Sequence, residues 1–388
     1  MKNADKFTVI IPTRERANVL GAALNTVTAQ NYDNLQIIVS DNFSTDSTRD
    51  IVEALHDPRI TYLNTGKRLS MSHNWEFALS HVRGGWIAII GDDDGLLPGA
   101  ISKAHEIANE YDVSAISSRA AAYTWPNSST HPYGELTIYR GKGVELHDSR
   151  TALRDACSGR IPYSSLPMLY TGGFVDSELI EKARRAGGSF YHSMIPDVYS
   201  AIVFTKLTNK YACSNTPLAI GGTSVHSGGT SYMSKKDTAG SGESPGMKFI
   251  SEPNIPFHPS LLPSKDNAFP PSIELLVYES ILQTEHIPPS CQSLTNNAEQ
   301  LALILGKVKR RHRAEVERWS EQFAERYALD LAAIRRKARN IRSWEKILKF
   351  ARSISQQNHT LKISGTSQSS INDVYEASLI ADRAMNSR

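Results

Sequence analysis

Three consecutive aspartates are the strongest chemical signal in the sequence. Asp92, Asp93 and Asp94 directly follow residues 86–91, most of which are apolar and favour a strand. Adjacent carboxylates repel one another, and a divalent cation is an economical way to compensate that repulsion. Carboxylate oxygens suit Mn²⁺ or Mg²⁺, which also bind phosphate oxygens. The cluster therefore predicts a Mn²⁺ or Mg²⁺ site, the alternative being an acidic turn that caps the helix expected from Gly99.

Polar and charged side chains also follow three earlier apolar runs. They are Pro12, Thr13, Arg14 and Arg16 after residues 7–11, Asp41 after residues 35–40, and Lys67, Arg68 and His73 after residues 60–63. Arginine and lysine can clamp phosphate. A lone aspartate can accept a hydrogen bond from a nucleobase or cap a turn.

The elements that carry these residues alternate in hydrophobic period. Strands are expected at residues 7–11, 35–40, 60–63, 86–90 and 113–118, and helices at 19–30, 46–55, 70–82 and 99–110. This alternation predicts an α/β fold with a mostly parallel sheet. Ligands of such sheets bind at the carboxyl ends of the strands, where the polar residues lie.

The remainder of the chain is less regular. We expect strands at residues 136–139 and 168–174, and helices at 151–158, 177–185, 197–207, 273–283, 297–322 and 324–354. Residues 220–246 are rich in Gly and Ser, and proline punctuates 251–272. The predicted organisation is a catalytic domain at 1–246 (halves 1–120 and 121–246), a linker at 247–272 and a helical C-terminal region at 273–388.

Together these motifs resemble the family 2 glycosyltransferases, which have the GT-A fold. The resemblance rests on Ile11-Pro12-Thr13-Arg14 after the first strand, on Asp41-Asn42 with Ser44-Thr45-Asp46-Ser47-Thr48 after the second, and on Asp92-Asp93-Asp94 with Pro98 after the fourth. It covers residues 7–120 and, more loosely, 165–210. The resemblance implies a Rossmann-like sheet with flanking helices and a nucleotide-diphospho-sugar donor.

The resemblance also implies roles for individual residues. Pro12, Thr13 and Asp41 would hold the nucleoside, and Asp92 or Asp93 would contact the ribose. Asp94, with Asp92, would ligate the metal that bridges the diphosphate. Arg14, Arg16, Lys67 and His73 would complete the donor site; many members carry Arg at the position of His73, and often Asp at that of Gly91.

The acceptor hydroxyl needs a base to take its proton. The position that matches the family's base is Asp197, where Pro196 replaces the usual acidic neighbour. Asp197 could instead serve only as a helix cap, and His192 is the rival base. His226, in the Gly/Ser-rich segment, would close over the diphosphate and metal, unless it is simply a solvated loop side chain.

Composition narrows the class of protein. The net charge of +3 is too balanced for a dedicated nucleic-acid binder, and the three cysteines form neither a disulfide framework nor a zinc pattern. No apolar run reaches membrane-spanning length, and the N-terminus lacks an apolar signal region, so we expect a cytoplasmic protein.

Residues 307–349 hold 14 Lys or Arg and 6 Asp or Glu. This tail is either a solvated helical pair or a basic patch for anionic lipid at the inner membrane.

The resemblance, together with the aspartate cluster, thus implies an inverting, metal-dependent glycosyltransferase. It would move a sugar from a nucleotide sugar, expected to be a UDP-sugar, to a glycan or lipid-linked acceptor in bacterial surface polysaccharide synthesis. The alternatives are a sugar-phosphate nucleotidyltransferase and a sugar-nucleotide-binding scaffold without catalysis. The glycine-rich first loop usual in the nucleotidyltransferases is absent here.

Overall fold

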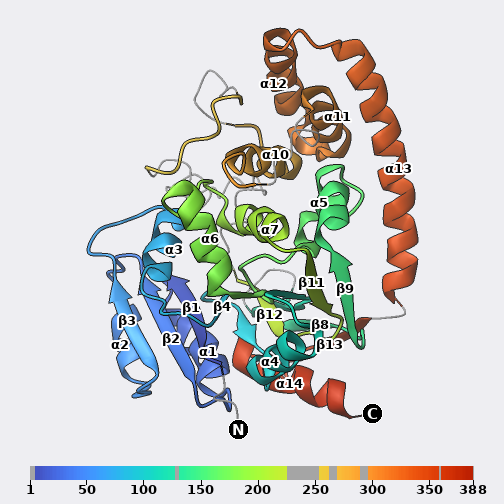
Figure 1. The fold of residues 1–388 in the computed structure, drawn as a ribbon. Helices are drawn as coiled ribbons and strands as arrows, with labels where there is room; N and C mark the ends of the chain where they lie inside the picture. Colours follow the sequence, from blue (N-terminus) through green and yellow to red (C-terminus); the bar gives the residue numbers. More distant parts are fainter. Residues whose placement is uncertain are drawn as a thin grey trace.

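A computed structural model of the chain describes residues 5–126, 131–224, 253–261, 269–288, 296–357 and 360–387. Its main body is an eight-stranded sheet with helices on both faces, and a helical region stands above it (Figure 1). The strands follow the order β3-β2-β1-β4-β10-β6-β11-β9. Their bounds are β1 Phe7–Thr13, β2 Leu35–Asp41, β3 Ile60–Asn64, β4 Trp86–Ile89, β6 Ala115–Ser118, β9 Val144–Asp148, β10 Phe174–Asp176 and β11 Lys210–Ser214.

The first four strands of the sheet are parallel to one another, as expected. β1 pairs with β2 and β4, and β2 pairs with β3. Alternate residues of β1 enter opposite cores: Ile10 packs with α3 and α7, whereas Val9 and Ile11 pack with α1 and α4. Both faces of β1, β2 and β4 are therefore largely buried, which explains why these strands read as continuous apolar runs, whereas the edge strand β3 is partly exposed.

Helices cover the two faces of this sheet. On the catalytic body they are α1 Ala17–Thr28, α2 Thr48–Glu53, α3 Met71–Leu79, α4 Ala100–Tyr111, α5 Ser149–Cys157, α6 Ser177–Gly187 and α7 Pro196–Leu207, with the short 3₁₀ turn η1 Tyr163–Ser165. These elements confirm the predicted α/β fold. The expected strand at 168–174 is wrong, because only Phe174 belongs to a strand.

A second, five-stranded sheet has the order β13-β8-β7-β12-β5. Its strands are β5 Gly95–Leu96, β7 Ala121–Thr124, β8 Glu135–Tyr139, β12 Ala219–Thr223 and β13 Thr360–Ser364. β12 overlaps the start of the Gly- and Ser-rich segment, residues 220–246, and it pairs with both β5 and β7. Tertiary pairing therefore orders the glycine-rich start of that segment.

The C-terminal region contains the expected helices and more. They are α10 Ile273–Gln283, α11 Asn297–Lys307, α12 Arg313–Arg326 and α13 Leu331–Gln357, with the 3₁₀ turn η3 Arg310–His312. The helix expected over 297–322 is thus two helices with a break between them. α10 packs on α7, and α13 packs on α11.

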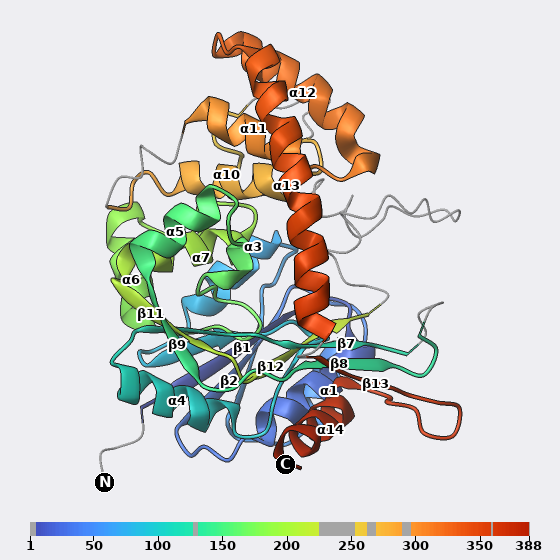
Figure 2. The same ribbon diagram turned by 90° about the vertical axis from the view of Figure 1, so that its right-hand side faces the viewer.

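The last part of the chain returns to the main body, which the sequence analysis did not expect. α13 descends along the molecule, β13 then pairs with β8, and α14 Val374–Asn386 packs against α1 (Figures 1 and 2). Tyr123 donates a hydrogen bond to the carbonyl oxygen of Ile371, 248 residues away. The predicted division into domains remains a prediction, but residues 360–387 pack with the body that holds the aspartates.

Candidate functional site

The ends of the parallel strands bring the predicted donor residues to one edge. In the register of the sheet, Thr13 lies beside Asp41, and Asp41 lies beside Asn64. The hydroxyl of Thr13 donates to an oxygen of Asp92 at 2.9 Å, so the end of β1 contacts the aspartate cluster directly. Arg16 lies 3.7 Å from the other oxygen of Asp92. The expected meeting of the strand ends is confirmed for these residues.

Asp94 is buried and accepts three hydrogen bonds from backbone and hydroxyl donors. One of its oxygens accepts from the Gly222 N–H at 2.7 Å. The other accepts from the Gly91 N–H at 2.9 Å and from the hydroxyl of Thr171. A Cβ at position 91 would lie 2.8 Å from both the Asp94 oxygen and the Tyr170 hydroxyl. Close packing therefore explains why this chain has Gly where many family members have Asp.

Asp93 faces a different neighbour. Its carboxylate accepts from the N–H and the hydroxyl of Ser224, at 3.3 and 2.7 Å. Its carbonyl oxygen accepts from the indole N–H of Trp125 at 3.0 Å. A Cβ at Gly222 would lie 1.8 Å from that carbonyl oxygen, so only glycine permits this approach of β12.

Burial and mutual repulsion place an electrostatic cost on the cluster. Burial, and then the charge of Asp93, raise the pKa of Asp92 to about 7, although Arg16 and Thr13 oppose the shift. Burial and Asp93 likewise raise the pKa of Asp94 to about 6. The carboxylates lie in surroundings that penalise their negative charge.

The donor set of this cluster fits a hard divalent cation. Among the described residues, no three His, Cys, Asp or Glu side chains converge as a metal-binding group. Mg²⁺ and Mn²⁺ do not require such a cage, because they commonly bind one or two carboxylates together with substrate phosphates and water. Asp94 and Asp92 would be those ligands, and a cation there would offset both the burial and the repulsion that raise their pKa values.

Asp41 is buried and already hydrogen-bonded within the protein. One oxygen accepts from the Ser44 N–H at 3.0 Å. The other accepts from the Tyr62 hydroxyl at 2.5 Å and the Asn64 amide at 3.1 Å. A carboxylate offers about four lone-pair sites, so one more donor can still be accepted. The predicted contact with a nucleobase remains a prediction.

The remaining predicted donor residues lie at or after the ends of β1 and β3. Pro12 is half-buried within β1, and Arg14 is half-buried in the loop that follows. Lys67 and His73 are exposed, and a ring nitrogen of His73 lies 2.7 Å from the Ser70 hydroxyl at the start of α3. Their roles toward the donor stay predictions.

Asp197 lies in the first turn of α7, near Tyr170, whose pKa responds to the charges of both Asp197 and the cluster. Burial raises the pKa of Asp197, although backbone N–H groups at the helix start oppose the shift. The charge of Asp197 is the main cause of the raised pKa of Tyr163. Burial, then Asp94, and more weakly Asp197, raise the pKa of Tyr170. The predicted base and the predicted metal ligand are therefore both close enough to act on Tyr170.

The loop that precedes Asp197 is held from two sides. On α3, the carboxylate of Glu76 accepts the N–H groups of Phe190 and Tyr191 at 3.1 and 3.0 Å. On α10, Glu279 accepts from the hydroxyl of Ser193 at 2.5 Å. The Ser193 carbonyl oxygen accepts from the hydroxyl of Ser72 at 2.8 Å. Residues of the donor half and of the C-terminal region thus jointly position the loop that leads into α7, the helix that carries Asp197.

The two histidines singled out in the sequence have different outcomes. His192 lies in the same loop, 4.4 Å from His286 between ring centroids, and its Nε2 lies 3.2 Å from the Ser189 carbonyl oxygen. It stays the rival base. His226 lies outside the residues that the structure describes.

Sequence reasoning missed several residues of this site. They are Tyr170, Thr171, Gly222, Ser224 and Glu279. The sequence analysis placed residues 168–174 in a strand, but Gly172 has φ +94°, and a Cβ at Gly173 would lie 1.7 Å from the Met168 carbonyl oxygen. The paired glycines were the signal for a tight turn, which brings Thr171 to Asp94.

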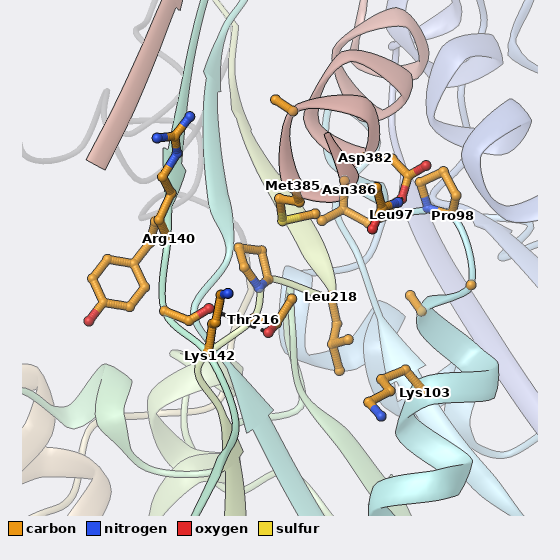
Figure 3. Close-up of a pocket in the computed structure, with 16 residues that line it drawn as sticks. Leu97, Pro98, Lys103, Arg140, Lys142, Thr216, Leu218, Asp382, Met385 and Asn386 are labelled. Carbon is orange, nitrogen blue, oxygen red and sulfur yellow. Dashed lines mark hydrogen bonds between the residues drawn. The ribbon is translucent and has the colours of Figure 1, made fainter. Parts of the chain in front are cut away.

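A separate cavity of about 440 Å³ lies away from the aspartates, where β8, the start of α4 and the end of α14 meet (Figure 3). Lys103, Arg140 and Lys142 contribute to its lining. None of the predicted site residues lines it.

Among the described residues, no helix combines the length and apolar character that a bilayer crossing requires.

Comparison with known proteins agrees with this geometry. Residues 8–160 match the model of glycosyl transferase family 2. A GalNAc(5)-diNAcBac-PP-undecaprenol beta-1,3-glucosyltransferase of Campylobacter jejuni is 33% identical over 154 residues, which cover 39% of this chain and 47% of that protein. Glycosyltransferase GlyA of Streptococcus pneumoniae is 30% identical over 112 residues, covering 28% of this chain and 16% of that protein. The chain therefore spans less than half the length of these relatives.

Among solved structures, residues 1–349 of Staphylococcus aureus TarS in complex with UDP-GlcNAc superimpose with a TM-score of 0.52. The alignment covers 89% of this chain and 92% of that chain at 16% identity, so it shows a shared fold. The sequence match, the shared fold and the strand-end cluster agree with one another. Residues 8–160 are therefore similar to glycosyl transferase family 2, and the chain has the α/β fold of TarS, as the predicted GT-A architecture requires.

Proposed function

We propose that the chain is an inverting, metal-dependent glycosyltransferase that uses a nucleotide sugar, most simply a UDP-sugar. The observation that supports the proposal is that Asp92 and Asp94 follow the end of β4, where Thr13 of β1 contacts Asp92, while the charges of Asp94 and Asp197 both act on Tyr170. The UDP-GlcNAc named with TarS supports the choice of donor. The undecaprenol-linked substrate in the name of the Campylobacter relative supports a glycan or lipid-linked acceptor.

The proposed reaction is a direct displacement at the anomeric carbon. The acceptor oxygen forms a bond to that carbon while the bond to the diphosphate oxygen breaks. Asp197 takes the acceptor's hydroxyl proton as general base. A bound Mn²⁺ or Mg²⁺ would neutralise negative charge on the leaving diphosphate. Asp94 and Asp92 would hold the ion, and Thr13 and Arg16 orient Asp92.

The start of α7 suits the proposed base. Burial raises the pKa of Asp197, which makes its carboxylate a stronger proton acceptor than an exposed one. A carboxylate at the start of a helix is also stabilised by the helix dipole, so it remains available in its charged form. The acceptor would be lipid-linked or glycan material at the cytoplasmic face of the inner membrane in bacterial surface polysaccharide synthesis.

A donor screen tests the proposal. The full chain is incubated with UDP-, GDP- and dTDP-sugars, with and without Mn²⁺, and the released products are quantified. We expect one nucleotide sugar to stabilise the chain thermally and to release nucleoside diphosphate, with release abolished by EDTA. Release of pyrophosphate from a sugar phosphate and a nucleoside triphosphate would instead identify a nucleotidyltransferase. Stabilisation with no turnover, even with acceptor extracts, would favour a binding scaffold.

A further inference from the structure

Helix α13 carries an unusual exposed surface. Trp344, Ile347 and Leu348 are 65%, 57% and 38% exposed. They are three of only eight large hydrophobic side chains that are exposed among the described residues, and they lie within little more than one turn. Residues three and four apart share a helix face, so the three side chains form one patch.

Trp344 and Ile347 of this patch point away from the packed side of the helix, whereas Leu348, seven residues after Ile341, lies at the edge of that side. Ile334, Ala338 and Ile341 of α13 pack into the helical core with α11. Glu345 continues that inner stripe, where it pairs with Lys307 at 2.8 Å. At 100° per residue, Trp344 and Ile347 lie outside that stripe. Figure 2 shows α13 running along the outside of the molecule, from the helical region down to the sheet.

Basic side chains border the patch. α13 holds eight Lys or Arg residues and one acidic residue. Some are used internally: Arg335 pairs with Glu321, and Arg342 donates to the Leu305 carbonyl oxygen. By contrast, the exposed side chains of Arg336, Arg339 and Lys346 make no ion pair or hydrogen bond to another described residue. Arg339 and Lys346 are seven residues apart, so they form one stripe beside Ile347.

We propose that the outward face of α13, composed of Trp344, Ile347, Arg336, Arg339 and Lys346, binds an anionic lipid surface. Protruding apolar side chains on a convex helix fit the fluid interface of a bilayer, where Trp is favoured. The neighbouring cations are attracted to anionic headgroups. This surface is distinct from the proposed sugar-transfer site and goes beyond the proposed function.

Vesicle co-sedimentation of the full chain tests the surface. The vesicles contain equal parts of phosphatidylglycerol and phosphatidylcholine, and phosphatidylcholine alone serves as the neutral comparison. Wild type should bind the anionic vesicles, and added salt should weaken the binding. Partitioning of the W344A/I347A variant into the anionic vesicles should fall by about tenfold or more, because the two side chains no longer bury apolar area in the bilayer interface. The R339Q/K346Q variant should lose the preference for anionic lipid while retaining thermal stability.

Matched controls separate this face from general surface properties. L146A/L379A removes two exposed apolar side chains elsewhere, and R140Q/K142Q removes two exposed cations elsewhere. Both controls should bind as wild type does. Circular dichroism verifies that each variant is folded, and nucleotide-sugar turnover without vesicles should be unchanged in all of them.

Three results would overturn the inference. One is wild-type chain that stays in the supernatant with anionic vesicles at low salt. Another is W344A/I347A and R339Q/K346Q both binding like wild type. The third is analytical ultracentrifugation showing a wild-type dimer that W344A/I347A converts to a monomer, since the face would then be an interface between copies of the chain.

Discussion

The donor edge and the base loop of this molecule are built in opposite ways. At the donor edge, consecutive strand–helix units place Thr13, Asp41 and Asp92 side by side through parallel pairing. At the base loop, Ser193 is held by Ser72, 121 residues earlier, and by Glu279, 86 residues later. The comparison teaches that one half of a proposed reaction can rest on a local repeating pattern while the other half depends on distant parts of the chain.

The largest expected effect tests the donor edge. Asp94→Asn removes a charged ligand while it preserves the shape of the side chain, so metal-dependent turnover should fall by about 10⁴-fold or more. Isothermal titration with UDP and Mn²⁺ should show the loss as weaker binding. Asp112→Asn, a change at an exposed aspartate at the end of α4, is the matched control. Unchanged UDP–Mn²⁺ affinity in Asp94→Asn would mean that the metal assignment is wrong.

The second effect tests the base loop. Asp197→Asn should spare donor binding and lower the rate of transfer by about 10²–10⁴-fold, the usual scale of general-base loss. Because a protonated base cannot accept a proton, the wild-type rate should fall as the pH drops through the raised pKa of Asp197. That acidic limb should vanish in the variant.

A rate that survives Asp197→Asn would move the base elsewhere, and His192→Gln then becomes the decisive variant. If donor affinity fell together with the rate, Asp197 would also contribute to donor binding. The donor edge and the base loop would then not act independently. Steady-state kinetics at several donor concentrations distinguishes these cases.

The third effect concerns the support from α10. Burial raises the pKa of Glu279 from 4.5 to about 7 in the folded chain. Between those values the folded state holds more protons than the unfolded state, so this group's stabilising contribution is complete below pH 4.5 and is lost as the pH rises to about 7. Glu279→Gln should remove that loss and be more stable than wild type by about 1–3 kcal/mol at pH 8.

Urea denaturation at pH 5 and pH 8 measures this difference. Glu279→Ala is the informative comparison, because it leaves the Ser193 hydroxyl without its acceptor and should be destabilised at both pH values. Equal stability of Glu279→Gln and wild type at pH 8 would show that the buried carboxyl does not titrate as described.

The smallest effect links the two regions. Thr171→Val removes the hydroxyl that donates to Asp94 and keeps a similar volume. Loss of one such hydrogen bond costs about 1 kcal/mol, so the affinity for Mn²⁺ in the presence of UDP should fall by roughly fivefold. Thr171→Ser keeps the hydroxyl and should stay near wild type. A Val variant indistinguishable from Ser would mean that this contact does not tune Asp94.

Much of the fold was predictable where the pattern was local. The alternation of short apolar runs with helix-period segments over residues 7–118 predicted an α/β fold with a mostly parallel sheet, and the structure confirms it. The strand predicted at 168–174 failed because a tight turn at Gly172 and Gly173 interrupts an apolar run. β13 and α14 were missed because their partners, β8 and α1, lie more than 200 residues away.

The sequence by itself determined that Asp92, Asp93 and Asp94 end a buried parallel strand, because the hydrophobic period and the neighbouring carboxylates are local properties of the chain. Only the tertiary structure decided which donor each carboxylate meets: Thr13 for Asp92, Ser224 for Asp93, and Thr171 with Gly222 for Asp94. These partners come from separate strands and loops. Their approach depends on close backbone packing at glycines, which no periodic pattern in the sequence encodes.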